Sequence, residues 1–224
     1  MKQRKTEHPI LFSGPMVRAI LEGRKTQTRR TNGFHMKWLN KDPNNFRHKN
    51  FKLADKFEFW DIKNGVCQFA ESPFQPGDTL WVREKWQAWC EFNKTPPRDL
   101  PEKARLRINY PANGNMWDDA VLRHSIHMPR WASRIALHVE DVRVERLQDI
   151  SEEDAMAEGV KITISGDFTL TTRFMNYTKK GDHASSAIAS FSTLWDSLNA
   201  ARGLGWDANP WVFAYKFSVK EVRT

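Results

Sequence analysis

The segment 23–30, Gly-Arg-Lys-Thr-Gln-Thr-Arg-Arg, places a lysine, two threonines and three arginines close together. A threonine hydroxyl becomes a useful nucleophile only when a base removes its proton, and a lysine can be that base only when neutral. The ordinary lysine pKa of about 10.4 leaves roughly one lysine in a few thousand neutral at pH 7. Like charges and desolvation both lower a lysine pKa, so the neighbouring arginines favour Lys25 as a base for Thr28. The same cationic cluster could hold a developing oxyanion or an anionic substrate group. Its arginines are Arg24, Arg29 and Arg30.

The spacing of Lys25 and Thr28 limits this hypothesis. Residues three apart on a regular strand point to opposite faces, so the two side chains converge only if Lys25 lies in the turn before the strand. The plain alternatives are a surface lysine after a helix, where a cation is favourable, and an ordinary strand threonine. For the arginines the alternative is a solvated face.

Local signals predict the elements that flank this segment. A short helix is expected over residues 14–22, with Ser13 or Gly14 as its cap, Pro15 at its first position and Gly23 at its end. Residues 24–30 then begin a strand. Further on, the turn 76–78 leads into a strand over residues 79–84.

The longest strand signal covers residues 131–147. Its apolar positions alternate and then change parity, which indicates a one-residue bulge near Glu140-Asp141. The apolar positions before the change are Ile135, Leu137 and Val139, and those after it are Val142 and Val144.

The C-terminal third of the chain predicts two more helices and a strand. Ser151 caps a short helix that ends at Gly159, and a longer helix is expected over residues 187–198. A final strand over residues 211–219 carries a core face of Trp211, Phe213, Tyr215, Phe217 and Val219. Short strands over 57–60 and 66–69 and a long loop over 91–120 complete the pattern. The expected fold class is α+β, with curled antiparallel strands and short helices.

The segment 23–30 also fits the Gly-x-Lys-x-x-x-x-Arg motif, and by it the chain resembles the ASCH domains of the PUA-like superfamily. The turn at 76–78, the strand 134–147 with its following helix, and the last strand resemble that family in the same order. The resemblance implies one domain over residues 1–224, a PUA-like curled β-barrel with short flanking helices. Insertions are then expected at 31–74, 87–128 and 160–187. The chain is most similar to the larger ASCH proteins of tailed phages and prophages.

One ASCH branch comprises bacterial amidohydrolases that deacetylate N4-acetylcytidine with a Lys proton acceptor, a Thr nucleophile and a Glu proton donor. Carried over by motif, these roles fall on Lys25 and Thr28. If Ser151 matches the threonine that begins the corresponding helix, the donor falls on Glu158, and Arg30 would shape the pocket. Glu158 lies where a helix dipole disfavours a carboxylate, although the plain alternative is a solvated glutamate. A close pair with Lys25 would keep both groups charged, so the two would titrate as a coupled unit.

The charge of the chain leaves a second class of function open. Its 224 residues carry 35 Lys+Arg against 27 Asp+Glu, a formal charge of +8, which suits either solubility or an anionic partner. Basic and aromatic residues interleave at 34–38, 46–52 and 128–131, a mixture that suits stacking on unpaired bases. Arg130 and Trp131 are the binding candidates there, unless the aromatics only anchor inserted loops. The alternatives to an amidohydrolase are therefore an RNA- or DNA-binding module that uses the same basic cleft, or a ribonuclease.

Other signals narrow the classes further. No apolar run is long enough to span a membrane, and the first residues lack the apolar stretch of a signal peptide. Two cysteines cannot form a disulfide framework, so a reducing cytoplasm is expected. No cofactor or metal is expected, because nucleotide-binding, hydrolase-elbow and deaminase motifs are absent and the His and Cys residues lack ligand spacing. The residues weighed as metal ligands are Cys67, Cys90, His124 and His127.

Overall fold

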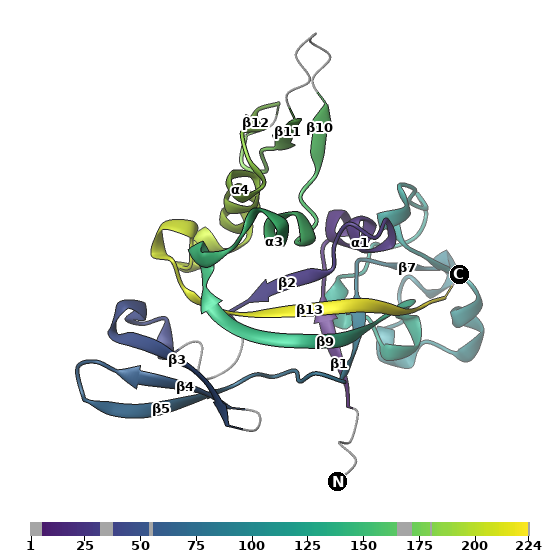
Figure 1. The fold of residues 1–224 in the computed structure, drawn as a ribbon. Coiled ribbons are helices and arrows are strands. Elements are labelled where there is room, and N and C mark those ends of the chain that lie inside the picture. The colour runs from purple at the N-terminus through teal and green to yellow at the C-terminus, as the bar shows by residue number, and fades with distance from the viewer. Residues whose placement is uncertain (1–5, 32–37, 54–55, 165–171, 180, 224) are drawn as a thin grey trace. The chain divides into compact units, whose positions relative to one another are not determined.

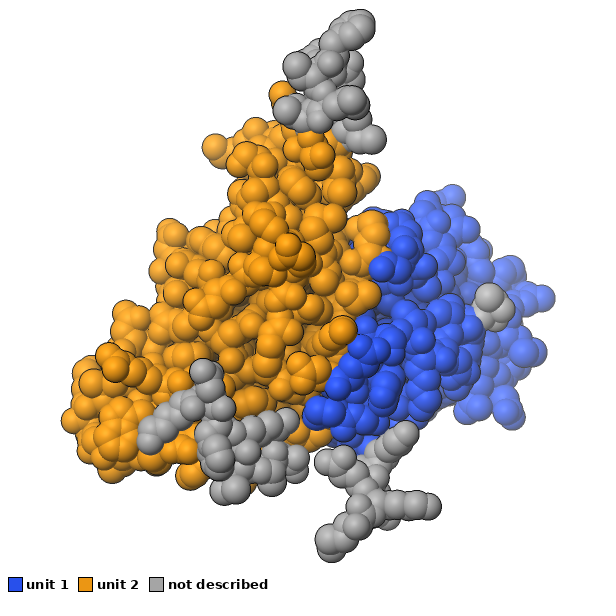
Figure 2. Space-filling view, viewed as in Figure 1, with its two compact units in different colours: residues 1–23, 76–140, 217–224 blue, residues 24–75, 141–216 orange. Residues whose placement is uncertain are grey.

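The computed structural model describes residues 6–31, 38–53, 56–164, 172–179 and 181–223. The chain has a mixed α+β fold, as expected, and divides into two compact units (Figure 2). Unit 1 comprises Met1–Gly23, Pro76–Glu140 and Phe217–Thr224. Unit 2 comprises Arg24–Gln75 and Asp141–Lys216. The single domain with three insertions stays a prediction.

The largest sheet has five strands in the order β1-β6-β9-β13-β2 (Figure 1). Its strands are β1 (Glu7–Leu11), β2 (Gln27–Arg30), β6 (Thr79–Arg83), β9 (Ile135–Arg146) and β13 (Trp211–Val222). The two long strands, β9 and β13, each contribute residues to both units. Within the described residues the order has two ends, at β1 and β2, so the strands do not close into the barrel that was expected.

Unit 1 is built on β1, which is parallel to β6, and on β6, which is antiparallel to the first half of β9. The helix α1 (Gly14–Leu21) starts after Ser13, with proline in its first turn, close to its predicted bounds. Gly77 adopts φ 97° in the predicted turn and donates its N–H to the Val139 carbonyl at 2.8 Å. This positive φ is accessible to glycine at little cost.

The segment 87–128 of unit 1 is mostly short turns, and within it residues 91–120 agree with the loop predicted there. It holds β7 (Gln87–Ala88), β8 (Ile108–Asn109) and the 3-10 turns η2 (Cys90–Phe92), η3 (Pro97–Asp99), η4 (Glu102–Leu106), η5 (Pro111–Asn113) and η6 (Ser125–His127). A further turn, η7 (Arg130–Ala132), precedes β9. A small core packs beneath these turns around the fully buried Trp86.

Unit 2 pairs β2 antiparallel with the first half of β13, from Gln27 opposite Lys216 to Arg30 opposite Phe213. The helices α3 (Glu152–Ala157) and α4 (Ala187–Asn199) pack on a second core that includes Leu147, Phe191 and Trp195. The remaining strands are β3 (Phe46–Leu53), β4 (Lys56–Asp61) and β5 (Val66–Glu71) in one sheet, and β10 (Ile162–Ile164), β11 (Thr172–Met175) and β12 (His183–Ala184) in another. Short 3-10 turns lie at η1 (Pro43–Asn45), η8 (Leu147–Asp149), η9 (Ala200–Arg202) and η10 (Trp206–Ala208).

Burial along β9 confirms the predicted change of parity. Glu140 and Asp141 are both exposed, whereas the apolar side chains on either side of them are buried. These buried residues are Ile135, Leu137, Val139, Val142 and Val144. Burying a side chain of this size contributes about 1.5–3 kcal/mol, which fixes the facing of both halves of the strand.

The predicted core face of β13 is wrong at its end. Trp211, Phe213, Tyr215 and Phe217 are buried, but Val219 is 44% exposed. Val219 belongs to the last stretch of β13, residues 218–222, all of which are exposed and lie beyond the part of the strand that pairs with β2. In the part of the chain that the structure describes, no helix has the length and apolar character to span a membrane.

Candidate functional site

The predicted base and proton donor lie side by side in unit 2. Lys25 forms an isolated antiparallel bridge with Glu158, the residue that caps the C-terminus of α3. The Thr26 N–H adds a backbone hydrogen bond to the Ala157 carbonyl at 2.8 Å. Directly opposed residues of an antiparallel pair project their side chains to the same side. The bridge therefore sets the lysine beside the glutamate.

The two side chains form a buried ion pair. The Lys25 Nζ donates to the Glu158 Oε2 and to its backbone carbonyl, both at 2.8 Å. The lysine side chain is 0% exposed and that of the glutamate 4%. On its other oxygen, Oε1, Glu158 accepts a hydrogen bond from the Arg29 Nη1 at 3.1 Å. Each carboxylate oxygen thus has its own cationic donor.

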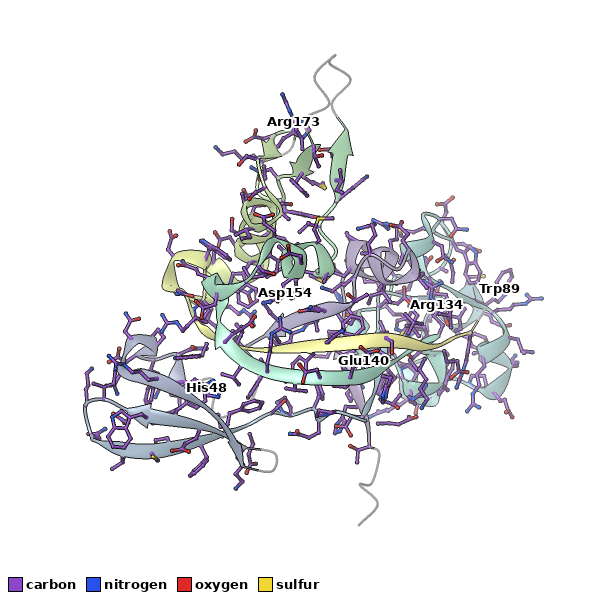
Figure 3. All side chains as sticks on the ribbon, in the orientation of Figure 1. His48, Trp89, Arg134, Glu140, Asp154 and Arg173 are labelled. Carbon is purple, nitrogen blue, oxygen red and sulfur yellow. The ribbon has the colours of Figure 1, made fainter. Side chains whose placement is uncertain are left out.

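Arg29 links this pair to two more carboxylates. Its Nε donates to the Glu145 Oε1 at 2.7 Å, and its Nη2 donates to the Asp154 Oδ2 at 2.8 Å. Arg143 in turn binds both of these carboxylates, and Gln27 donates to Asp154 at 2.7 Å. Asp154 is labelled on α3 in Figure 3. We call this set the charge network. It holds three cations, Lys25, Arg29 and Arg143, and three carboxylates, Glu145, Asp154 and Glu158, with Gln27 at its edge.

Four members of the charge network escaped the sequence analysis. The alternation of β9 does place Arg143 and Glu145 together, on the face opposite Val142 and Val144. Nothing local says that β2 lies within reach of that face. Asp154 lies in the first turn of α3, where a negative charge is favourable in any helix, so its position gave no signal of a partner. The fourth is Gln27.

Burial is the largest single influence on the pKa of Lys25, Arg29 and Asp154, but it decides the direction of the shift only for Lys25. Desolvation lowers the pKa of Lys25; the charge and hydrogen bond of Glu158 oppose this, and Arg30 and Arg29 lower the pKa further. Burial also lowers the pKa of Arg29, but its three carboxylates outweigh this and raise it above its ordinary value. For Asp154 burial acts upward, whereas the hydrogen bond of Gln27 and two arginine charges bring its pKa below the usual value.

The predicted nucleophile, Thr28, lies in β2 opposite Tyr215 and is 3% exposed. Strand alternation puts Thr28 and Arg30 on the face away from Gln27 and Arg29. Within the described residues the Thr28 hydroxyl makes no hydrogen bond, to Lys25 and Glu158 included. Lys25 lies before β2 begins, so strand alternation does not force its side chain to the face opposite Thr28. The charges of Arg29 and Arg30, which lie on the two faces of β2, both lower the pKa of Lys25.

The other predicted binding residues lie in different surroundings. Arg24 donates to the Gly159 carbonyl at 3.0 Å, and Arg30 is half-buried with a pKa lowered by burial. Arg130 and Trp131 belong to unit 1, where Arg130 pairs with Glu7 at 2.8 Å. The Trp131 ring packs edge-on against the ring of Trp86, with 6.1 Å between centroids.

The basic and aromatic segment 46–52 falls on β3, and residues 34–37 lie outside the described part of the chain. His48, labelled in Figure 3, packs on Phe59 with 5.4 Å between ring centroids, and Trp38 packs on Phe46 at 4.5 Å. In these contacts the aromatic side chains anchor the segments that carry them. Among the described residues, no group of three or more His, Cys, Asp and Glu side chains is placed to hold a metal ion.

The position of Glu158 depends on how α3 begins. The Ser151 hydroxyl accepts a hydrogen bond from the Asp154 N–H at 3.1 Å, as an N-cap does. We expect Ser151→Ala to lower the free energy of unfolding by about 1 kcal/mol, because one helix N–H loses its acceptor. Urea denaturation measures this. Ser186→Ala, which removes the corresponding cap of α4, is the matched variant, and a neutral Ser151→Ala would contradict the assigned cap.

Comparisons with known proteins leave the family open. No protein-family model matches the chain, and no curated protein matches it in sequence. Among solved structures, it is similar to a crystal structure of protein EF3133 from Enterococcus faecalis V583, of the family DUF984. The two share 10% sequence identity with a TM-score of 0.40, over 100% of this chain and 86% of the other. So distant a likeness defines neither the fold family nor the function.

Proposed function

We propose that the chain is an amidohydrolase of an acylated cytosine nucleoside of the N4-acetylcytidine type, on a PUA-like fold of the ASCH kind. The observation that carries the proposal is the buried Lys25–Glu158 pair. It joins the lysine of the Gly-x-Lys motif to the glutamate that the resemblance implies. An amine and a carboxyl group in contact, away from water, are suited to exchange a proton.

The pair resolves the conflict between its two roles. Its ionic and neutral forms differ only in which partner holds one proton, and the Lys25 and Glu158 atoms concerned are 2.8 Å apart. Desolvation lowers the pKa of Lys25, which favours its amine as a proton acceptor, and the hydrogen bond to Glu158 gives the lysine proton a direct path to the carboxylate. A single internal proton transfer along this bond prepares both groups.

The chemistry then follows two half-reactions. Lys25 accepts the Thr28 hydroxyl proton while the oxygen attacks the acetyl carbonyl carbon, and Glu158 gives its proton to the departing N4 nitrogen. This forms an acetyl ester on threonine and releases cytidine. Water then attacks the ester: Glu158 takes one proton from the water, and Lys25 gives the proton it holds to the departing Thr28 oxygen. This restores the threonine hydroxyl and the starting state of the pair, and the acetyl group leaves as acetic acid, which ionises in solvent. The guanidinium of Arg30 supports the oxyanion.

The test follows cytidine and acetate release from N4-acetylcytidine by the purified full-length chain. Turnover by the wild type is expected, together with loss of turnover in Thr28→Val, which keeps the shape but removes the hydroxyl. Thr26→Val is the matched control: the same change at an exposed position two residues away should leave turnover intact. Equal activity of Thr28→Val and the wild type would remove the threonine from the mechanism.

An inactive wild type would instead favour a nucleic-acid-binding module, the reading suggested by the formal charge of +8. That reading requires RNA or DNA binding that weakens steeply as salt rises, because phosphate contacts release counterions. An inactive chain that binds no nucleic acid would contradict both readings.

A further inference from the structure

We infer that Arg29, held by Glu145 and Asp154, is a positioning residue that governs the orientation and proton affinity of the Lys25–Glu158 pair. The catalytic meaning of this inference rests on the proposed function, whereas its electrostatic part does not. The sequence analysis placed Arg29 among the residues that bind substrate. In the structure its side chain is 0% exposed, and its donors face carboxylates. It therefore acts through Glu158 rather than on a ligand.

The geometry of Arg29 leaves it little freedom. Its Nε and Nη2 lie 2.7 and 2.6 Å from the same Glu145 oxygen, and Nη2 lies 2.8 Å from Asp154. Two sides of a planar guanidinium are thereby fixed, and the third donor, Nη1, is directed to Glu158. An arginine whose planar guanidinium makes several hydrogen bonds holds a carboxylate in one orientation far better than a flexible lysine does.

The supporting carboxylates are themselves fixed to regular elements. Glu145 is on β9 and Asp154 is on α3, and Arg143 joins them. Side chains that are locked by a surrounding shell of hydrogen bonds hold functional groups more accurately than side chains on loops. Arg29 thus holds the Glu158 carboxylate by its Oε1, while Lys25 binds its Oε2.

The balance of charge in the network predicts two opposite effects on Lys25. Neutralising Arg29 removes a positive neighbour and leaves an excess of carboxylates, so Lys25 should keep its proton to higher pH. Neutralising Glu145 removes a counter-charge of Arg29, which then engages Glu158 more strongly, and Lys25 should lose its proton at lower pH. The groups that face Lys25 and the pair are Arg24, Arg29 and Arg30 from residues 24–30, Arg143 and Glu145 from β9, and Asp154 and Glu158 from α3 and its end.

The experiment titrates Lys25 directly in the full chain. Lysine is labelled with ¹³C at Cε, and the Lys25 signal is assigned by its loss in Lys25→Met. We expect the titration midpoint to move up in Arg29→Gln and down in Glu145→Gln. Glu153→Gln, an exposed acid of α3 outside the charge network, should leave it unchanged. Shifts in the same direction, or no shift in either variant, would overturn the inference.

Two further readouts keep the outcomes separable. If Arg29→Gln does not fold, Glu145→Gln alone decides the electrostatic part by the sign of its shift. If the wild type hydrolyses N4-acetylcytidine, Arg29→Gln should lower turnover about 10–100-fold, as is typical when a residue that orients a functional side chain is replaced. The pH profile of its turnover should move in the same direction as the Lys25 midpoint. A profile that stays in place while the midpoint moves would exclude the positioning role. If the wild type is inactive but Arg29→Gln and Glu145→Gln move the Lys25 midpoint in opposite directions, the proposed function is refuted and the electrostatic part of the inference holds.

Discussion

Glu158→Ala is expected to lower the free energy of unfolding by about 3–5 kcal/mol, the cost of breaking a buried ion pair by removing one partner. Lys25 then keeps a charge in a site where its side chain is 0% exposed, with two arginines as neighbours. Arg29 retains Glu145 and Asp154, so the lysine is the group left without a counter-charge.

The loss of stability in Glu158→Ala should depend on pH, and it should be smaller at higher pH. Without Glu158 the pKa of Lys25 in the folded state falls further below the ordinary 10.5, because the influence that raised it is gone. Between that lowered value and about 10.5 the unfolded chain binds the proton and the folded chain does not, so stability rises with pH. The difference in the free energy of unfolding between Glu158→Ala and the wild type should therefore become smaller from neutral pH to about pH 10, as measured by urea denaturation.

A double variant separates this effect from lost packing. Lys25→Met/Glu158→Gln removes both charges at nearly constant volume and should recover most of the stability that Glu158→Ala loses. If the double variant is as unstable as the single one, and the gap stays constant with pH, the ion pair is not the source of the loss.

Lys25→Met is expected to reduce turnover of N4-acetylcytidine by about 10²–10⁴-fold, the usual contribution of a general base. Methionine fills the space of the lysine stem but accepts no proton. The fold should persist, because Glu158 keeps the bond from Arg29 to its Oε1. Its backbone carbonyl and its Oε2 each lose a donor, at a cost of about 1–3 kcal/mol for each group.

Initial rates across pH test this role. In the wild type the rate should fall as Lys25 and Glu158 lose their shared proton to solvent, because Glu158 then has no proton to donate. Desolvation lowers the pKa of Lys25, so this fall should lie below pH 10.5. Lys25→Met should lack this fall. Lys161→Met, which removes an exposed lysine of the same unit, is the control and should behave as the wild type. A Lys25→Met enzyme with an unchanged profile would assign the base to another group.

The sequence by itself determined the local elements and their facing. Proline and glycine set the ends of α1, Ser151 set the start of α3, and the alternation of β9 fixed its change of parity at Glu140-Asp141. These features depend on the preferred dihedral angles of single residues and on which side chains avoid water, and both are encoded within a few neighbouring positions. The Gly-x-Lys motif and its resemblance also named Lys25 and Glu158.

Only the tertiary structure decided what those residues touch. Lys25 and Glu158 are 133 positions apart, and their contact comes from a bridge between the approach to β2 and the end of α3. The roles of Glu145 and Asp154, the open ends of the sheet and the exposure of Val219 depend in the same way on which strand lies beside which. A local pattern specifies how each strand faces but not its neighbour, because register and pairing are fixed by distant residues that must bury their surfaces and satisfy their charges together.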